Sequence, residues 1–390
     1  MSERQLASVQ RITEIRQIEG ADKIQVAMMN GLGWECVVKK NEFFVGDLVV
    51  YIQIDSIVPE CDEFEFLRVR KFRVRTIKLK GQVSQGLVVP LSILNGWTQD
   101  VSDGYFKTLK VVTDHKEGDD VTDLIGIKKY DPQAQEEQKL ATEFKSKSKV
   151  LTFCMGFTVF RWIYFKLNHV DKGWPSWGVG KTDEERIQTC AKLFMNNMDK
   201  PWYITEKVDG QSATYFYHKS MKWGIPKWIF GVCSRNIWLK KPTNGSYWKV
   251  AEKFDLEKKF TALKTELVVQ GENLGPSIQK NKYELAEYDL MVFNLKKNGV
   301  NYSIAEVEKF CNEQGLKTVP IIHRAFDPKS LGNLPEVKDV VQAIVQMSIG
   351  ASVLNPKIPR EGLVFRLVEN PNVSFKIINP EFLLKYENKE

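Results

Sequence analysis

A lysine in a short polar segment near the middle of the chain has the features of a nucleophile. Lys207 follows a strand-like run and lies in the sequence EKVDG, residues 206–210. Gly210 would let the backbone approach a phosphate group, because glycine has no side chain. Asp209 could hold a cation whose charge helps to keep the lysine amine neutral and reactive. Because such short segments also occur in exposed turns, the neighbouring motifs must decide between the two interpretations.

Five further segments place charged residues in or beside apolar, strand-like runs. They are CSRN (233–236), VVQGEN (268–273), YDLMVFNL (288–295), REGLVFR (360–366) and SFKIIN (374–379). A charged side chain at the margin of a core is costly unless it is paired or bound to a ligand. The segments therefore indicate one shared pocket that also contains Lys207.

In this order, the segments resemble the motifs of the covalent nucleotidyltransferase superfamily, which comprises ATP-dependent ligases and capping enzymes. The resemblance covers roughly residues 150–388. The sequence GWPSWGVGKTDEERIQ before EKVDG looks like the equivalent part of RNA ligases that carry an N-terminal OB domain. The N-terminal sequences IEGADKIQVA, GDLVVYIQIDSIVPE and FRVRTIKLKGQVSQGLVVPL look like the OB domain of that group. We therefore expect an ATP-dependent RNA ligase.

The resemblance implies a reaction in three steps. Lys207 would attack the α-phosphorus of ATP, release pyrophosphate and carry AMP as a phosphoramidate. The AMP would pass to an RNA 5′-phosphate, and an RNA 3′-hydroxyl would then displace it, as in RNA repair. A hydrated Mg²⁺ or Mn²⁺ ion would be held by carboxylates, which hard cations prefer. The implied metal ligands are Asp209, Glu361 and Glu272.

The same resemblance assigns roles to further residues around the nucleotide. Glu272 and Arg235 would contact the ribose and the nearby phosphate, and Glu206 would face the adenine edge. Lys376 would neutralise the α-phosphate. Arg186 either binds phosphate or is a cation on the surface of a helix.

Two positions depart from the pattern of the superfamily. Ile378 stands where a second lysine often follows, spaced by one residue from Lys376. Lys385 or another cation would then make the second phosphate contact. The aromatic residue that stacks on the base is also displaced, since Leu290 lies near its expected place. Tyr288 shares the strand parity of Leu290 and could stack instead; otherwise an aliphatic side chain covers the purine.

Two alternatives use the same fold differently. An mRNA capping guanylyltransferase would use GTP, but it normally carries an OB domain after the last motif. Only fourteen residues follow Lys376, which is too few for a barrel. A noncatalytic RNA-binding protein should have lost the reactive side chains, yet all of them are present: Lys207, Asp209, Glu272, Glu361 and Lys376. We therefore expect the RNA ligase.

The elements that must position these residues begin with a barrel. Residues 1–96 contain short strand patterns, among them Ile24–Met29, 34–38 and 48–55, separated by turn signals such as Asn-Gly. Several short strands with a register break are typical of a small OB-type β-barrel, a fold that commonly binds nucleic acid. Residues 97–149 lose this pattern and are expected to be a linker or insert.

One expected strand of the barrel, residues 72–80 (FRVRTIKLK), alternates apolar and basic residues and changes register near Thr76. A bulge there would place all the cations on one face. These cations are Arg73, Arg75, Lys78 and Lys80. They would contact the phosphate backbone of RNA or only solvate an exposed face.

Residues 150–390 are expected to form the nucleotidyltransferase domain, an antiparallel sheet with helices, so that the whole chain is of the α+β class. Amphipathic runs predict helices at 305–313 and 337–348. Thr182 and Glu185 have the spacing of a capping box, which predicts a helix from Thr182 to about Met195.

The composition of the chain narrows its possible partners and cellular compartment but does not identify its function. The formal net charge of +7 is compatible with RNA but too small to prove it. The six cysteines are dispersed without a CxxC pair, which argues against structural zinc and a disulfide framework. The apolar residues 150–165 include Arg161 and are expected to be buried rather than to span a membrane. We expect a soluble intracellular monomer, in the cytoplasm or nucleus or in a host cytoplasm if viral, whose partners are ATP and RNA with 3′-hydroxyl and 5′-phosphate ends.

Overall fold

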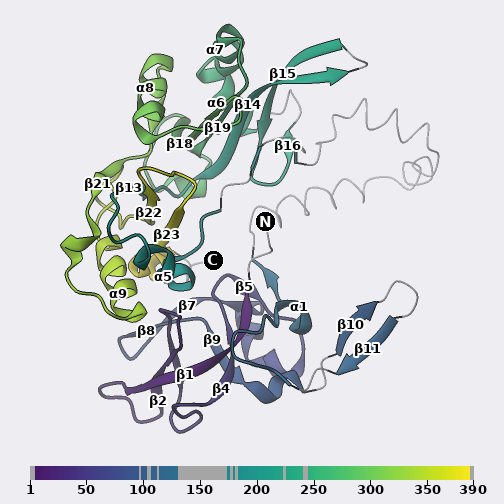
Figure 1. Ribbon diagram of the computed structural model, residues 1–390, viewed down its shortest axis with the longest axis vertical. Helices are drawn as coiled ribbons and strands as arrows, with labels where there is room; N and C mark the ends of the chain where they lie inside the picture. The colour runs from purple at the N-terminus through teal and green to yellow at the C-terminus, as the bar shows by residue number, and fades with distance from the viewer. Residues whose placement is uncertain are drawn as a thin grey trace.

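The computed structural model describes the backbone of most of the chain in three layers (Figure 1). An N-terminal barrel lies at the bottom of the view, a four-stranded sheet in the middle and a larger sheet at the top. The described residues are 5–95, 98–102, 107–111, 114–130, 174–175, 179–180, 183–222, 225–239 and 245–386. The expected α+β class with an N-terminal OB-type barrel is confirmed.

The N-terminal barrel is built from one five-stranded antiparallel sheet, in the order β3-β2-β1-β4-β9, and smaller sheets β12-β5-β6 and β7-β8. Alternating side chains of these strands fill one core, in which Trp34, Tyr51 and Phe64 are fully buried. The strands are β1 (Ala7–Gln17), β2 (Ile24–Met29), β3 (Glu35–Lys39), β4 (Leu48–Ile52), β5 (Ser56–Ile57), β6 (Arg73–Val74), β7 (Thr76–Leu79), β8 (Gln82–Gln85), β9 (Leu87–Pro90) and β12 (Lys128–Lys129). The helices are η1 (Asp62–Arg70), η2 (Leu91–Leu94) and α1 (Thr122–Ile125).

Residues 114–130, which were expected to belong to a linker or insert, pack against the barrel. Val121, Ile125 and Ile127 are buried in the barrel core, and β12 extends the sheet of β5. We therefore propose that the first domain reaches at least to Tyr130. Strands β10 (Thr98–Ser102) and β11 (Lys107–Val111) form a separate hairpin, while residues 131–149 lie outside the described part.

The middle sheet carries the first two residues of the EKVDG segment, Glu206 and Lys207. Its order is β21-β13-β22-β23, formed by β13 (Trp202–Lys207), β21 (Ile321–Phe326), β22 (Gly362–Leu367) and β23 (Ser374–Ile378). Helices α5 (Ile187–Met195) and α9 (Val337–Ser348) pack against it over an aromatic core that contains Phe194, Trp202, Phe365 and Phe375. Burying each of these rings contributes about 1.5–3 kcal/mol, which makes this sheet a rigid base for the residues at its edge.

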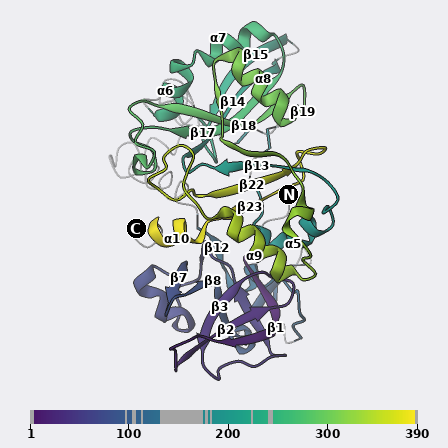
Figure 2. The ribbon, with the colours of Figure 1, turned by 90° about the vertical axis from the view of Figure 1, so that its left-hand side faces the viewer.

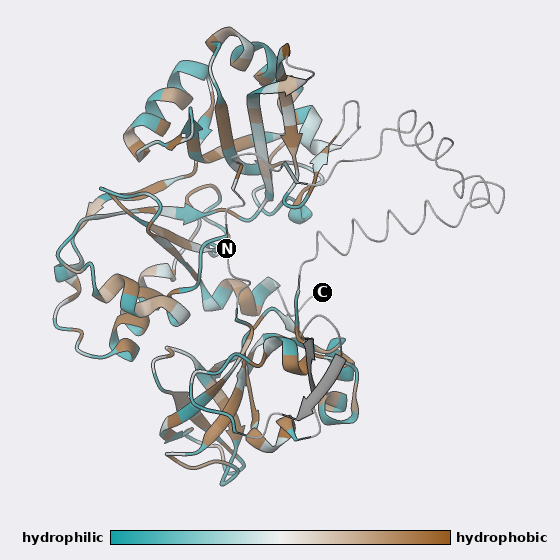
Figure 3. Cartoon of the chain, turned by 45° about the vertical axis from the view of Figure 1, so that its right-hand side comes forward, coloured by the Kyte–Doolittle hydropathy of each residue, from teal (hydrophilic) through white to brown (hydrophobic). Residues whose placement is uncertain are grey.

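The upper sheet has the order β16-β15-β14-β17-β18-β19, and β20 pairs with β18 in parallel. Brown hydrophobic stretches run along its strands in Figure 3, and the helices that cover it carry both brown and teal. Its strands are β14 (Gln211–Lys222), β15 (Ile225–Cys233), β16 (Trp238–Leu239), β17 (Leu267–Leu274), β18 (Asp289–Lys297), β19 (Val300–Asn301) and β20 (Lys317–Thr318). The helices are α6 (Ser246–Lys253), α7 (Leu256–Leu263) and α8 (Ile304–Gln314), with η3 (Gln279–Asn281) and η4 (Pro328–Leu331) in connections.

The C-terminal end of the chain joins the barrel to the middle sheet. Helix α10 (Pro380–Tyr386) lies between these two layers (Figure 2). Ile378, at the end of β23, and Leu383 of α10 are both buried in the barrel core. A second lysine at position 378 would therefore be buried among apolar side chains, which explains why isoleucine stands there.

The helix that was expected to start at Thr182 is shorter than predicted. Thr182 lies outside the described residues, but Asp183 to Glu185 are not helical and α5 begins at Ile187. Arg186, at its N-cap, has extended backbone angles and forms a bridge to Lys376 of β23. The capping-box prediction was wrong because this segment pairs with a strand, and its charged side chains bind partners in other parts of the chain.

No helix in the described part of the chain is long and apolar enough to cross a membrane. The apolar residues 150–165 lie outside that part.

Candidate nucleotide-binding site

A cavity opens between the middle and upper sheets, with about 630 Å³ of space including part of the solvent at its mouth. It is large enough for a small-molecule ligand. Strands from both sheets contribute side chains to its wall. The expected site residues among its lining are Glu206, Lys207, Arg235, Glu272 and Lys376.

Lys207 ends β13 and pairs in register with Gly362 of β22. A side chain at Gly362 would meet the carbonyl oxygen of Ile377 at 2.0 Å, so only glycine allows these strands to approach so closely. The adjacent Glu361 accepts a hydrogen bond from Nζ of Lys207 at 2.6 Å. Burial opposes the charge of the lysine, but the carboxylates of Glu361 and Glu272 outweigh burial and raise the pKa of Lys207.

Three carboxylates surround this lysine. Burial raises the pKa of Glu272 to about 8 and that of Asp209 to about 6, and the nearby charge of Glu361 adds to both shifts. One carboxylate oxygen of Glu272 and one of Glu361 are buried without a hydrogen-bond partner. Such an arrangement is expensive for the protein alone and would be relieved by a bound cation. Within the described ranges, however, no three acidic, histidine or cysteine side chains are grouped closely enough to hold a metal ion by themselves.

Asp209 has two partners that the sequence did not suggest. Its carboxylate is ion-paired with Lys282, and its backbone N–H donates to the hydroxyl of Tyr283 at 2.8 Å. Both partners follow η3 in a connection 73 and 74 residues further along the chain. These contacts fix the turn that follows Lys207.

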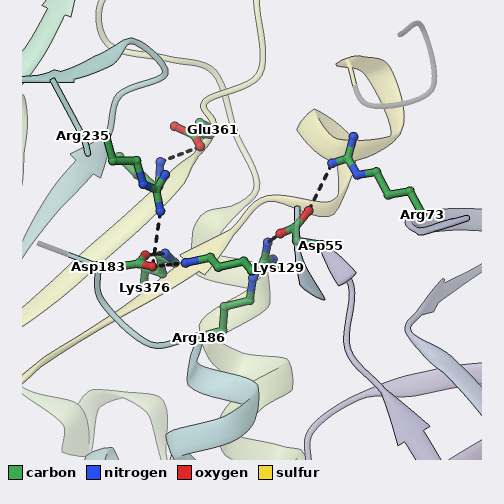
Figure 4. A network of polar contacts seen from close by, with 9 residues as sticks. Asp55, Arg73, Lys129, Asp183, Arg186, Arg235, Glu361 and Lys376 are labelled. Atoms are coloured by element: carbon green, nitrogen blue, oxygen red, sulfur yellow. Dashed lines mark hydrogen bonds and ion pairs between the residues drawn. The ribbon is translucent and has the colours of Figure 1, made fainter. Parts of the chain in front are cut away.

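A second charged cluster lies on the other side of the cavity, centred on Asp183 (Figure 4). Its carboxylate accepts from Lys376 at 2.7 Å and from Arg235 at 3.3 Å, and it is ion-paired with Lys129 of the N-terminal domain. Burial opposes the charge of Asp183, but the two lysines hold its pKa well below the usual range. Burial lowers the pKa of Lys376 to about 8, although Asp183 opposes this shift.

Arg186 is neither on a helix surface nor on the cavity wall. It is 4% exposed, and its guanidinium donates to Asp55 of the barrel at 2.6 Å (Figure 4). The interpretation of Arg186 as a cation on the surface of a helix was therefore wrong. Its role as a phosphate ligand stays a prediction.

Glu206 precedes Lys207 on β13 and also lines the cavity, and its contact with the adenine edge stays a prediction. One oxygen of its carboxylate accepts a hydrogen bond from the backbone N–H of Val353 at 2.8 Å.

Phe293 is an aromatic side chain of the cavity wall that was not among the expected site residues. Phe293 and Val364 line the cavity from facing sheets. Leu290 is 0% exposed in the core under the helices. Tyr288 does not line the cavity, and its hydroxyl bonds with that of Ser277 at 2.7 Å.

Ordinary strand alternation accounts for the position of Phe293. Leu290 and Val292 pack in the core under the helices, whereas Met291 and Phe293 lie on the opposite face of β18. Tyr288 has the parity of Leu290 and packs against the same core, so neither side chain lies on the face that lines the cavity. The register shift between β17 and β18, where Val292 pairs with Gly271 and Asn294 with Gln270, affects the positions that follow Phe293.

The basic strand of the barrel does not present its four cations on one exposed face. The strand is interrupted near Thr76, as expected, because Arg75 separates β6 from β7. Arg73, however, is 5% exposed, ion-paired with Asp55 at 3.2 Å and stacked 3.6 Å above the Tyr130 ring. Arg75 is half-buried, whereas Lys78 and Lys80 are exposed.

Comparisons with known proteins agree with this architecture. A family model described as an OB-fold domain matches residues 6–91, and one described as RNA ligase matches residues 200–378. A comparison with curated protein sequences found no significant match.

Solved structures of an RNA ligase from Naegleria gruberi are similar over the whole chain. A lysine-to-methionine variant with AMP and manganese has a TM-score of 0.73 and 27% identity, covering 99% of this chain and 100% of that one. The same ligase with pyrophosphate gives a TM-score of 0.72 and 27% identity, with 99% of each chain covered. A further variant with ATP and manganese gives 0.72 and 26%, covering 98% and 100%. With the cavity and the barrel described above, these matches support an ATP-dependent RNA ligase that carries an N-terminal OB domain.

Proposed function

We propose that this RNA ligase joins RNA 3′-hydroxyl and 5′-phosphate ends through an AMP group carried on Lys207, as an RNA repair enzyme would. The contact of Lys207 with Glu361, in a cavity with cations on one side and Phe293 on the other, carries this proposal. The Naegleria gruberi ligase, which has been solved with ATP, AMP and manganese, supports it.

The nucleotide would lie between the two sheets. Phe293 and Val364 would enclose the purine, because flat aromatic and branched aliphatic side chains pack well on a base. Glu272 would face the ribose, and Lys376 and Arg235 would bind the α-phosphate. All five side chains line one cavity.

The first step needs the amine of Lys207 to be neutral. Nζ would attack the α-phosphorus while the bond to pyrophosphate breaks, and Glu361 is placed to hold the proton that Nζ loses. Lys376 and Arg235 would stabilise negative charge on the reacting phosphate, which is a major contribution in phosphoryl transfer. In the second step an oxygen of the RNA 5′-phosphate attacks the same phosphorus, the phosphorus–nitrogen bond to Lys207 breaks, and Nζ regains its proton. In the third step the RNA 3′-oxygen attacks the 5′-phosphate and AMP leaves.

Carboxylates of this site fit a divalent cation. Asp209, Glu361 and Glu272 supply oxygen donors, two of which have no hydrogen-bond partner, and because the three are not grouped closely, waters would complete the coordination shell. The bound ion would neutralise charge on the phosphates and reduce the attraction that keeps Lys207 protonated.

The test is incubation with α-³²P-labelled ATP or GTP and Mg²⁺, followed by denaturing electrophoresis, for the natural chain and Lys207→Ala. We expect label from ATP that the variant loses. Lys200→Ala is the matched control, because Lys200 pairs only with exposed Glu369 among the described contacts. Label from GTP instead would indicate capping chemistry. No label in folded protein would mean that the fold serves RNA binding alone.

The transfer of AMP to RNA and the sealing of the RNA ends are tested with nicked and single-stranded RNA that carries a labelled 5′-phosphate. Transfer of AMP to that phosphate, followed by sealing to a 3′-hydroxyl, is the expected result. Blocking the 3′ end with a deoxy terminus should stop the reaction at adenylylated RNA. Sealing of a 5′-hydroxyl end would contradict the end chemistry.

A further inference from the structure

We propose that Lys282 is a positioning residue that competes with the divalent cation for Asp209. Its ammonium binds this carboxylate, and the cation displaces it toward two aromatic rings of helix α10. This inference rests on the proposed function, because it takes Asp209 as a residue of the cation site. It adds to that site a lysine that was not among the expected residues.

The connection between β17 and β18 contacts the turn after β13 at three points. The side-chain amide of Gln279 donates to the carbonyl oxygen of Gly210 at 3.4 Å. The ammonium of Lys282 is ion-paired with the carboxylate of Asp209. The hydroxyl of Tyr283 accepts from the backbone N–H of Asp209 at 2.8 Å. Because the side chains of Lys282 and Asp209 are only 12% and 15% exposed, their pair is shielded from water and stronger than a surface contact.

The backbone of this connection is strained just before Lys282. The three residues of η3 have φ angles of 47°, 58° and 47°, in the left-handed region that residues with a side chain rarely adopt. Such backbone persists only where the surrounding contacts enforce it, and it gathers at functional sites. Here the side-chain amide of Asn355 donates to the carbonyl oxygen of Lys282 at 3.0 Å. These contacts fix the backbone of Lys282 beside Asp209.

The ammonium of Lys282 has a second environment within reach. It lies 5.5 Å from the ring centre of Phe382 and 5.0 Å from that of Tyr386. Both rings belong to α10, between the barrel and the middle sheet (Figure 2). The face of an aromatic ring attracts a cation within about 6 Å. Because the stem of a lysine is flexible, the ammonium can leave Asp209 and stay near the rings while its backbone remains fixed.

A divalent cation and the ammonium would compete for one carboxylate. Two cations at the same carboxylate repel each other, whereas a divalent cation can replace the charge of Lys282 and bind further oxygen ligands. Asp209 would keep a positive partner in both states, which avoids the cost of an unpaired buried charge. We therefore expect Lys282 to lower the affinity for the cation and to hold the turn in place before the cation binds.

The experiment compares Mn²⁺ binding to the full-length natural chain, Lys282→Met and Lys280→Met. Lys280 is exposed in the same connection, so its variant controls for the loss of one positive charge there. Free Mn²⁺ is measured by electron paramagnetic resonance at a fixed concentration of AMP, which needs no catalysis. Removal of the competing ammonium should raise the Mn²⁺ affinity several-fold in Lys282→Met and leave it unchanged in Lys280→Met.

A purely structural role for Lys282 gives the opposite sign. Loss of the ion pair would then disorder the turn, and Mn²⁺ would bind more weakly to Lys282→Met. Weaker or unchanged binding would overturn the inference. Lys282→Arg keeps a cation at Asp209, so its Mn²⁺ affinity should not rise, and a rise equal to that in Lys282→Met would also contradict competition by charge.

Tyr386→Leu tests the second environment while leaving the ion pair in place. Without this ring the displaced ammonium is less well stabilised, so the Mn²⁺ affinity should fall. Lys385 also lies over the Tyr386 ring, at 5.4 Å, so the effect is measured again in the Lys282→Met background. There it should disappear, as a double-mutant cycle requires of a coupled pair. An equal fall in both backgrounds would show that the ring acts without Lys282, and the displacement would be wrong.

These results can be separated from the proposed reaction. Labelling with α-³²P-labelled ATP reports formation of lysyl-AMP, whereas the Mn²⁺ titration reports only the cation site. Normal labelling of the natural chain with an unchanged Mn²⁺ affinity in Lys282→Met would contradict this inference alone. Competition between Lys282 and Mn²⁺ in a chain that forms no lysyl-AMP would contradict only the reaction. A natural chain that bound no Mn²⁺ would contradict the cation site, and this inference with it.

Discussion

Nζ of Lys207 donates a 2.6 Å hydrogen bond to Oε1 of Glu361, a residue 154 positions further along the chain. Glu361 precedes the strand that pairs with β13, so the register of β13 and β22 fixes this contact. The contact holds the amine at the cavity wall and also favours its charged form. In the proposed reaction, Glu361 would therefore position the amine of Lys207 and set the pH at which this amine becomes reactive.

Replacing Glu361 by Gln should slow lysyl-AMP formation by about a hundredfold or more, a loss typical of removing one charged group from such a site. The carboxylate raises the pKa of Lys207, so the pH at which the variant reaches half its maximal rate should fall. Rapid-quench measurement of labelled protein across pH tests both effects. Glu369→Gln is the control, because Glu369 lies at the surface and pairs with Lys200. A natural rate and pH profile in Glu361→Gln would be incompatible with this role.

Phe293→Ala should weaken ATP binding by about 1–3 kcal/mol, the range for loss of an aromatic side chain that stacks on a base. Phe293→Leu keeps an apolar surface and should lose less. Tyr288→Phe is the control, since Tyr288 does not line the cavity. Equilibrium binding of ATP to all three variants measures the effect. Equal affinities in Phe293→Ala and the natural chain would show that another side chain covers the base.

Glu272 should make the stability of the ligand-free protein depend on pH. Burial raises its pKa to about 8 in the folded state from the ordinary value of 4.5 for a glutamate. The folded state then binds the proton more tightly between pH 4.5 and 8, and stability falls as pH rises through this window, by up to about 1.4 kcal/mol per pH unit. Glu272→Gln cannot ionise, so its melting temperature relative to the natural chain should be higher at pH 8.5 than at pH 5.5. A constant difference between the two proteins would argue against a raised pKa.

The cations of the barrel strand should divide into two groups. Lys78→Ala with Lys80→Ala should weaken RNA binding and reduce the salt slope of log affinity by about two, one for each phosphate contact. Both side chains are exposed, so the fold and AMP loading should be unaffected. Filter binding of RNA at several salt concentrations tests this. Unchanged affinity and slope would remove the barrel strand from the RNA surface.

Arg73→Ala should behave differently from the lysine variants, because Arg73 is buried against Asp55 and Tyr130. We expect a loss of about 1–3 kcal/mol in the free energy of unfolding, since the pair is buried but Asp55 keeps its contact with Arg186. Denaturant unfolding measures it. A variant with natural stability and reduced RNA affinity would instead place Arg73 at the RNA surface.

The sequence by itself determined the architecture and the position of the proposed nucleophile. Short contiguous patterns carry this information: the alternation of Ile24–Met29, the amphipathic run of α9 and the segment around Lys207 can each be read without knowing their neighbours in space. The order of the charged segments then indicated one pocket, and the structure places Glu272, Arg235 and Lys376 around it.

Only the tertiary structure decided which side chains of a strand line the cavity and which charged residues, far apart in the sequence, form pairs. The packing of the sheets decides that Met291 and Phe293, rather than Leu290 and Val292, lie on the face of β18 that is away from the helices, and Phe293 lines the cavity there. Arg73 became a buried structural residue because Asp55 faces it, and Asp183 meets Lys129 although 54 residues separate them. A charged side chain in the sequence shows only that a partner is needed. Folding brings the partner into contact range, and that choice is made by the whole packed structure rather than by local pattern.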